Sequence, residues 1–422
     1  MKNIALLFAL FGFHILLAQA QIGISDQNNF LIDWTNFKPK TVEYKKANEV
    51  LSGIIGSDKK LFRNKTYLLS GIVYITNNAK LVIESGTVIR GDYETCGTLV
   101  ITKGASIFAE GEPTSPIIFT SNKEVMERNP GDWGGIIILG DAPINRLGGV
   151  GFLNFDLDRT ISSYGGTNME SNSGVIKFVR IEFPGRKMQS SKEFNGLSLA
   201  GVGNKTKIEN IQVSFSNDDS FESYGGNIIL NNLVSYRATD DDFDFTQGVQ
   251  CNISNSLAVR YPYSSDVSTS RCFEIDTFDK PDMNDYAKKQ TSVVATNMTL
   301  INNEENTEGL IKEAIYVSEK SYFSLKESVV SGFSKFLLLD AKIEDSQINL
   351  SKIVLKDILV NSCVGFIESE NVLFNDKLNS FFADSKFTIK IKKIPNKLLL
   401  VECVDRNNFD FRLKNSDMIS YN

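Results

Sequence analysis

Short apolar runs, separated by Gly, Asn and Asp, recur along most of the chain. In the run Ile211-Gln212-Val213-Ser214-Phe215, apolar residues take every second position, which is typical of a strand with one buried face. No long amphipathic helical pattern separates these runs, and this argues against folds that alternate strands with helices. The pattern therefore predicts an all-β protein.

Two acidic runs, NDDSFE at 217–222 and TDDDFD at 239–244, give this pattern a period. A shift of 22 residues places Phe221 on Phe243 and Glu222 on Asp244, and it also aligns the aspartates of the two runs. A fixed period in the low twenties, with strand-forming residues between, is the signature of a β-solenoid. The predicted fold is a parallel β-helix. A β-sandwich is the main alternative, but it does not require such an offset.

The same reading predicts the domain organisation. It consists of a signal peptide at 1–20, an N-terminal lead-in or cap at 21–65, and a parallel β-helix at 66–422 with insertions near 146–172 and 261–292 and less regular rungs at 310–422. Insertions of this kind usually emerge from one face of a repeat protein and shape its binding site.

The N-terminus predicts secretion. Lys2 supplies a positive charge, an apolar stretch follows at 4–17, and Ala18-Gln19-Ala20 forms a cleavage site after Ala20. We expect an extracellular or outer-surface protein, with the periplasm as an alternative. No later segment reaches the roughly 18 apolar residues of a transmembrane helix. The one histidine, His14, lies inside the signal, which excludes histidine-based catalysis and histidine-ligated zinc from the mature chain.

The distribution of charge and the cysteines narrow the possible partners and structural classes of the protein. The chain carries 45 basic and 51 acidic residues, and residues 217–244 alone hold seven acids and one base. Such local acidity disfavours nucleic acid as a partner. The five cysteines do not form a disulfide framework. Cys251 and Cys272 are about one rung apart, so they are either core residues or a bridge between rungs.

Several motifs resemble one group of proteins. They are GDWGGIIILGDAPIN at 131–145, KFVRIEFPG at 177–185, and the two acidic runs. Together, over residues 66–276, they resemble uncharacterised secreted right-handed parallel β-helix proteins of Bacteroidetes-type bacteria. The resemblance implies a right-handed parallel β-helix at the cell surface or outside the cell, and it implies little about activity.

Strand alternation assigns the acidic residues to faces. If Phe221 and Phe243 point into the core, the predicted outward acids are Asp218, Glu222, Asp240, Asp242 and Asp244. Asp219 and Asp241 then point inward or lie at a corner. Allowing for the second insertion, Glu274 gives a third acidic step, and Asn195 gives an uncharged step before the first.

This acidic ladder has two interpretations. Carboxylates on neighbouring strands lie roughly 4.8 Å apart and repel one another, so they call for a cation, raised pKa values or full solvation. The functional interpretation is a Ca²⁺ site formed by Asp218, Glu222, Asp240, Asp242, Asp244 and Glu274, because oxygen ligands suit Ca²⁺. The structural interpretation is that aspartates at corners accept backbone N–H bonds.

For function, the sequence favours binding over catalysis. The leading hypothesis is a secreted or cell-surface β-helix that binds a glycan or envelope component, with Asn195, Arg237 and Arg260 as further ligand-binding residues. The alternative is a calcium-dependent polysaccharide lyase or glycoside hydrolase, since acids on adjacent rungs approach the spacing of retaining glycosidases. A second alternative is a structural spacer or adhesin. Arg237 also has a plain interpretation as a counter-ion of nearby aspartates.

Overall fold

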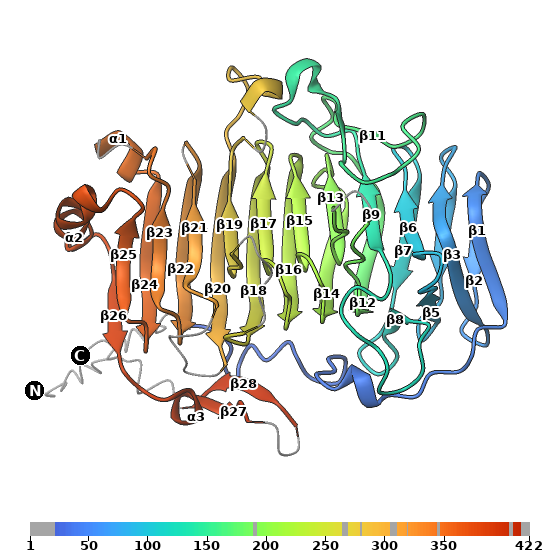
Figure 1. The fold of residues 1–422 in the computed structure, drawn as a ribbon, viewed down its shortest axis with the longest axis horizontal. Helices are drawn as coiled ribbons and strands as arrows, with labels where there is room; N and C mark the ends of the chain where they lie inside the picture. Colours follow the sequence, from blue (N-terminus) through green and yellow to red (C-terminus); the bar gives the residue numbers. More distant parts are fainter. Residues whose placement is uncertain are drawn as a thin grey trace, which may run out of the picture.

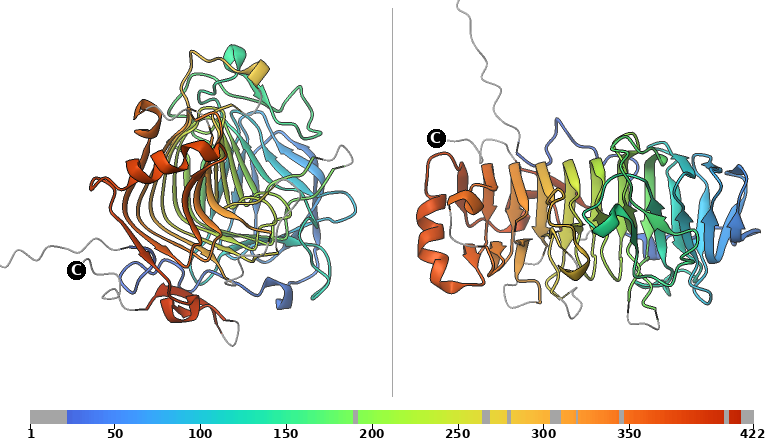
Figure 2. Two further views of the ribbon diagram at one scale, coloured as in Figure 1. Left: turned by 60° about the vertical axis from the view of Figure 1, so that its left-hand side comes forward. Right: turned by 90° about the horizontal axis from the view of Figure 1, so that it is seen from above.

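The protein winds into a rod of parallel strands (Figure 1). The computed structural model describes residues 22–188, 192–263, 269–278, 281–303, 310–318, 320–343, 347–404 and 408–414. The predicted signal peptide, 1–20, lies outside the described residues. Each coil contributes strands to three columns, which form the three sides of the rod seen in the left view of Figure 2.

The first column begins with the second halves of two long strands. Its members are β1 (Glu49–Ile55), β3 (Thr66–Ile75), β6 (Thr98–Ile101), β9 (Gly135–Leu139), β13 (Leu197–Ala200), β15 (Phe221–Tyr224), β17 (Phe243–Thr246), β19 (Phe273–Ile275), β21 (Glu313–Val317), β23 (Lys335–Leu339) and β25 (Gly365–Ser369). All pairings within the column are parallel.

Long bent strands supply most of the other two columns. The second column contains β2 (Lys59–Leu61), β4 (Lys80–Ile83), β7 (Ser106–Glu110) and the first halves of β12 (Gly174–Glu182), β14 (Lys207–Ser214), β16 (Asn227–Tyr236), β18 (Gln250–Arg260), β20 (Ser292–Asn302), β22 (Tyr322–Ser331) and β24 (Ile353–Asn361). The third contains the first halves of β1 and β3, then β5 (Val88–Gly91), β8 (Ile117–Ser121), the second halves of β12 to β24, and β26 (Ile389–Lys392).

Shorter elements decorate the rod. They are η1 (Pro39–Thr41), η2 (Leu147–Gly149), β10 (Gly151–Phe152), β11 (Ser163–Tyr164), η3 (Pro281–Met283), α1 (Gln347–Leu350), η4 (Val372–Phe374), α2 (Asn375–Phe382), α3 (Asn396–Leu399), β27 (Leu400–Glu402) and β28 (Asp410–Leu413). Residues Leu378 and Phe382 of α2 are buried against the last coils.

This architecture confirms the predicted parallel β-helix. The β-helix already includes β1 and β2. It therefore begins at Glu49, inside the segment expected as a lead-in. The two expected insertions lie together at the top of Figure 1. They touch through a bridge between Arg146 and Asn284, and Asp285 N donates to Asn145 O at 2.7 Å.

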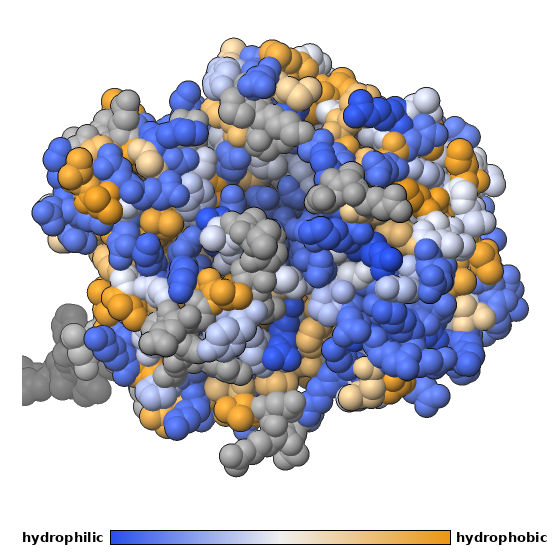
Figure 3. Space-filling view, viewed as in Figure 1, coloured by the Kyte–Doolittle hydropathy of each residue, from blue (hydrophilic) through white to orange (hydrophobic). Residues whose placement is uncertain are grey.

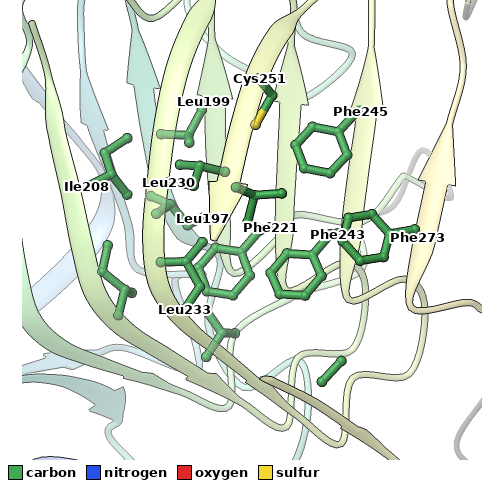
Figure 4. Packing of buried hydrophobic residues seen from close by; sticks show 14 of the residues in the cluster. Leu197, Leu199, Ile208, Phe221, Leu230, Leu233, Phe243, Phe245, Cys251 and Phe273 are labelled. Carbon is green, nitrogen blue, oxygen red and sulfur yellow. The ribbon is translucent and has the colours of Figure 1, made fainter. Parts of the chain in front are cut away.

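In the core, residues at equivalent positions of successive coils stack on one another. Phe221, Phe243 and Phe273 are in register, with ring centroids 5.4 and 5.2 Å apart (Figure 4). Stacked aromatic pairs add roughly 0.5–1.5 kcal/mol each beyond their burial. Cys251 and Cys272 are buried free thiols in this core, so the bridge between rungs does not form.

The bend between the second and third columns is made by a stack of asparagines. Asn210, Asn232, Asn255 and Asn297 have φ between 49° and 57°, the left-handed region that asparagine tolerates better than most residues. Asn297 Nδ2 donates to Asn255 Oδ1 at 2.8 Å, and Asn232 Nδ2 donates to Asn210 Oδ1 at 3.4 Å. We call these four residues the asparagine corner.

A second apolar cluster lies outside the rod, on the third column. Residues 22–47, here called the N-terminal strap, run along this side, and Trp34 of the strap is 1% exposed. The strap packs with β16, β18, β20, β22 and β24 and with the C-terminal hairpin of β27 and β28. Ile24 N donates to Thr299 Oγ1 at 3.0 Å, and Asn36 N donates to Gln212 Oε1 at 2.7 Å. The strap therefore crosses several coils.

Candidate functional site

Three carboxylates line up on the outward face of the first column. Glu222 of β15 pairs with Asp244 of β17, and Asp244 pairs with Glu274 of β19. All three are half-buried, while Phe221, Phe243 and Phe273 beside them face the core. The three-step ladder predicted from the sequence is therefore present. We call Glu222, Asp244 and Glu274 the carboxylate ladder.

The face that carries this ladder is polar and hollowed. Figure 3 looks onto the side labelled β13 to β19 in Figure 1, and its centre is a hydrophilic depression below the insertions. In register with the ladder, Ser198 precedes Glu222 and Tyr316 follows Glu274. Ser198, rather than the expected Asn195, is thus the uncharged step before Glu222.

Glu222 is held in place by two neighbours. Tyr224 OH and Asn195 Nδ2 both donate to Glu222 Oε2. Asn195 is 2% exposed, and its Nδ2 also lies 3.2 Å from Ser198 Oγ and from Tyr224 OH. Asn195, predicted as a ligand-binding residue, therefore orients the first ladder carboxylate from within the protein.

Asp219 and Asp241 form a second, buried pair beneath the ladder. They are 6% and 4% exposed, so the prediction that they point inward or lie at a corner is confirmed. Asp219 Oδ1 accepts from Asp241 N at 3.0 Å, and Asp241 Oδ1 accepts from Arg271 N at 2.5 Å. Each carboxylate thus caps the backbone of the following coil, across coils rather than within its own turn.

Burial and crowding raise the pKa values of Asp219 and Asp244. Burial is the main cause for Asp219, and the nearby carboxylates of Asp218, Asp240 and Glu222 raise its pKa further. Burial also raises the pKa of Asp244, with added repulsion from Glu222 and Glu274. A charged carboxylate here has lost water and gained like-charged neighbours. The site therefore favours a proton or a bound cation.

Two groups of carboxylates are close enough to share one cation. They are Asp218, Asp219 and Asp240, and Asp219, Glu222 and Asp244; within each group the ligand oxygens lie within 4.8 Å of one another. Asp219 belongs to both groups. Asp244 Oδ1 is buried and accepts no hydrogen bond from the described residues. An oxygen-rich site with an unsatisfied buried acceptor fits a hard cation such as Ca²⁺.

Glu274, the last ladder acid, is different because it has its own cation. Arg271 Nη1 forms an ion pair with Glu274 Oε2, and Arg271 Nε lies 2.9 Å from Glu313 Oε1. The Arg271 guanidinium also stacks over the Tyr316 ring at 4.3 Å. Sequence reasoning assigned no role to Arg271 or Glu313, since only the fold brings the strand that holds Glu313 beside β19. Excess negative charge is thus concentrated at the Glu222 end.

Asp242 and Arg260 are placed differently from the prediction. Both are 0% exposed and form an ion pair, with Arg260 Nη1 3.0 Å from Asp242 Oδ2. Ser235 Oγ also donates to Asp242. Asp242 precedes the first residue of β17, so strand alternation does not extend to it, and the chain turns its side chain inward. Neither residue reaches the outward face: the outward assignment of Asp242 is wrong, and Arg260 is a buried counter-ion.

The remaining predicted residues are Asp218, Asp240 and Arg237, and Arg237 lies apart from the two aspartates. Asp218 and Asp240 are half-buried next to Asp219 and belong to the first cation group. Arg237, at the other end of the turn that leads to Asp240, stacks over the Tyr261 ring at 3.5 Å. The structure therefore brings Asp218, Glu222, Asp240 and Asp244 together and places Arg237 on the third-column side.

Comparison with known proteins agrees with the parallel β-helix fold. The profile of the family described as "Pectate-lyase like beta helix domain" matches residues 53–393. The chain belongs to the pectate-lyase-like β-helix domain family. No curated protein matches the sequence.

Solved structures similar to this pectate-lyase-like β-helix come from a phage tailspike. One is the enzymatically active domain of tailspike protein 2 of bacteriophage CBA120, with 11% identity and a TM-score of 0.30 over 79% of this chain and 42% of that chain. The other is full-length tailspike protein 2 from Escherichia coli O157:H7 bacteriophage CAB120, with 10% identity and a TM-score of 0.27 over 79% and 38%. The chain thus spans less than half of each.

Among the described residues, no helix is long and apolar enough to cross a bilayer.

Proposed function

We propose that this β-helix is a secreted or cell-surface protein that binds a glycan along the first-column face, without cleaving it. A flat parallel sheet presents the same atoms on every coil, which suits an extended polymer with its own repeat. Carboxylates accept hydrogen bonds from sugar hydroxyls. Tyr224 and Tyr316, both half-buried on this face, add aromatic surface beside the acids.

One observation carries this proposal. Glu222 and Asp244 lie in register on adjacent strands, partly open to solvent, while Asp219 beneath them and Asp244 itself have raised pKa values. A protein that needs these positions only for folding gains nothing from repeated acids, because like charges opposite one another on neighbouring strands are destabilising. Such a set is explained by an external group that donates hydrogen bonds to these carboxylates or brings positive charge to them.

Calcium is the cofactor that the proposal includes. Asp219, Glu222 and Asp244 would hold the ion at the centre of the face, and its remaining positions would accept oxygens of the glycan. Ca²⁺ takes six to eight oxygen ligands in flexible geometry, so three carboxylates leave room for a ligand. The ion would also relieve the repulsion between these groups.

The test is a binding panel on purified protein. Neutral and uronic-acid polysaccharides are offered with calcium and with chelator, and both retention and released products are measured. We expect retention that requires calcium, no product, and loss of retention in Glu222→Gln. Lys177→Gln is a matched control, since Lys177 pairs with Glu209 on another face at 2.8 Å. No retention of any polysaccharide under either condition would overturn the proposal.

A second candidate function is glycoside hydrolysis on the same face. The oxygens of Glu222 and Asp244 lie within 4.8 Å of each other, near the roughly 5–5.5 Å between the carboxyls of retaining glycosidases. A raised pKa at Asp244 suits a general acid. A lyase is less well supported, because Arg271 is bound to two carboxylates and its pKa is raised, so it does not serve as a base. Product release abolished by Asp244→Asn would establish hydrolysis over binding.

A further inference from the structure

A cationic pocket lined with aromatic rings lies on the third-column side, away from the carboxylate ladder. It has a volume of about 440 Å³, and three parts of the chain form it. The coils contribute Phe215, Tyr236, Arg237, Tyr261 and Asn303; the N-terminal strap contributes residues 37–41; and the segment near the C-terminal hairpin contributes Cys403, Val404 and Phe409. This volume is within the range of small-molecule sites.

The aromatic rings hold one another in fixed positions. Phe37 packs edge-on against Tyr236 at 5.0 Å and against Phe409 at 5.8 Å, and Phe215 meets Tyr236 at 5.6 Å. Asn303 Nδ2 donates to Tyr261 OH at 3.1 Å and to Cys403 O at 3.0 Å. The Tyr261 ring is thereby anchored. The pocket walls are consequently preformed, which lowers the entropic cost of binding.

Two cations flank one ring of this pocket. The Arg237 guanidinium lies 5.7 Å from the Phe215 centroid, and Lys40 Nζ lies 5.9 Å from the same centroid. Phe215 and Arg237 have φ of 58° and 59°, so successive coils project both side chains from the same corner. None of the described residues that line the pocket is acidic. The charge here is therefore opposite to that of the carboxylate ladder.

The Arg237 guanidinium has donors to spare. Arg260 and Arg271, by contrast, form ion pairs with carboxylates at 3.0 and 2.9 Å. The Arg237 side chain has no carboxylate or hydrogen-bond partner among the described residues, and its Cζ instead lies over the Tyr261 ring, 3.5 Å from the centroid. Stacking leaves the edge of a guanidinium open for a bidentate contact with a planar anion.

We propose that this pocket binds a sugar residue that carries a carboxylate. The carboxylate would pair with Arg237, with Lys40 adding charge, and the apolar face of the sugar would lie on the aromatic walls. This site goes beyond the glycan-binding face, since it requires no metal and lies on a different column. It gives the protein a second contact, specific for acidic saccharides.

Isothermal titration with glucuronate, glucose and sulfate tests the proposal. We expect glucuronate to bind, glucose and sulfate to bind about tenfold more weakly or not at all, and Arg237→Gln to weaken glucuronate binding by about tenfold or more. Arg159→Gln is the matched control, because Arg159 stacks over Phe152 at 5.8 Å in the first insertion. Arg237→Lys keeps the charge without the planar fork and should weaken binding less.

The outcomes are distinguishable from those at the acidic face. Chelator and Glu222→Gln should leave glucuronate binding unchanged, whatever becomes of polysaccharide retention. Unfolding midpoints of Arg237→Gln and Arg237→Lys confirm that both variants fold. Sulfate binding as tight as that of glucuronate, full binding by folded Arg237→Gln, or no glucuronate binding to the wild-type protein would each overturn the proposal.

Discussion

The asparagine corner and the carboxylate ladder are both stacks of similar side chains on successive coils, but they differ in whether the stacked groups can hydrogen-bond to one another. An amide has a donor and an acceptor, so Asn297 donates to Asn255 along the rod. A carboxylate has only acceptors, so Glu222, Asp244 and Asp219 cannot satisfy one another. In the corner, amides donate to one another within the protein, whereas the ladder carboxylates need donors, protons or cations from other groups. This difference is the reason that we propose a ligand for the ladder and none for the corner.

The largest effect on stability should come from Asp242, the buried acid that is paired with Arg260. Asp242→Asn leaves Arg260 charged and fully enclosed, and breaking a buried pair typically costs about 3–5 kcal/mol. Chemical denaturation should show this loss with and without calcium. The double variant Asp242→Asn with Arg260→Gln should recover part of it, and an unchanged midpoint in the single variant would contradict the pairing.

Calcium should stabilise the wild-type protein by a smaller amount. If Asp219, Glu222 and Asp244 hold the ion, calcium at a hundred times its dissociation constant adds about 2.7 kcal/mol. Thermal unfolding with added calcium and with chelator measures this shift. Asp219→Asn should abolish it, and Glu209→Gln, at an acid that pairs with Lys177, should not. Equal midpoints with calcium and with chelator would sink the metal hypothesis.

Without a cation, Asp244→Asn should stabilise the protein at neutral pH. The pKa of Asp244 is raised in the folded state, so its carboxyl contributes full stability below the ordinary pKa near 4 and loses it as pH rises through the folded value. For each unit by which folding raises the pKa of Asp244, the variant should gain about 1.4 kcal/mol in its free energy of unfolding at neutral pH. Midpoints from pH 4 to 8 in chelator should fall for the wild-type protein and stay flatter for the variant. A variant less stable than wild type at pH 7 would contradict this sign.

The smallest effect is expected at the asparagine corner. Asn255→Gly keeps the left-handed backbone but removes the hydrogen bonds with Asn297 and Asn231, at a total cost of about 1–2 kcal/mol. This cost should not change with pH or calcium, since no charge is involved. A calcium-dependent loss in Asn255→Gly would show that the two stacks are coupled.

The period of the sequence predicted the fold and most of the ladder because both depend on local alternation. Phe221 and Phe243 fix which face is inward, and Glu222, Asp244 and Glu274 follow from them. The signal peptide and secretion remain predictions.

Predictions from strand alternation were wrong at the ends of strands. Asp242 sits just before β17 and turns inward, and Arg260, the last residue of β18, reaches it across the coil. The pairing of Arg271 with Glu313 and the role of the strap depend on contacts between distant segments. No short-range pattern encodes such contacts.

The N-terminal strap changes how this rod should unfold. In a simple solenoid each repeat contacts only its neighbours, so stability is a sum of local terms and ends fray independently. Here residues 22–37 of the strap pack on β16, β18, β20, β22 and β24 and on the C-terminal hairpin. Opening one middle coil therefore disturbs contacts shared by many others. Amide hydrogen exchange in these coils should report one cooperative unit rather than a gradient from the ends.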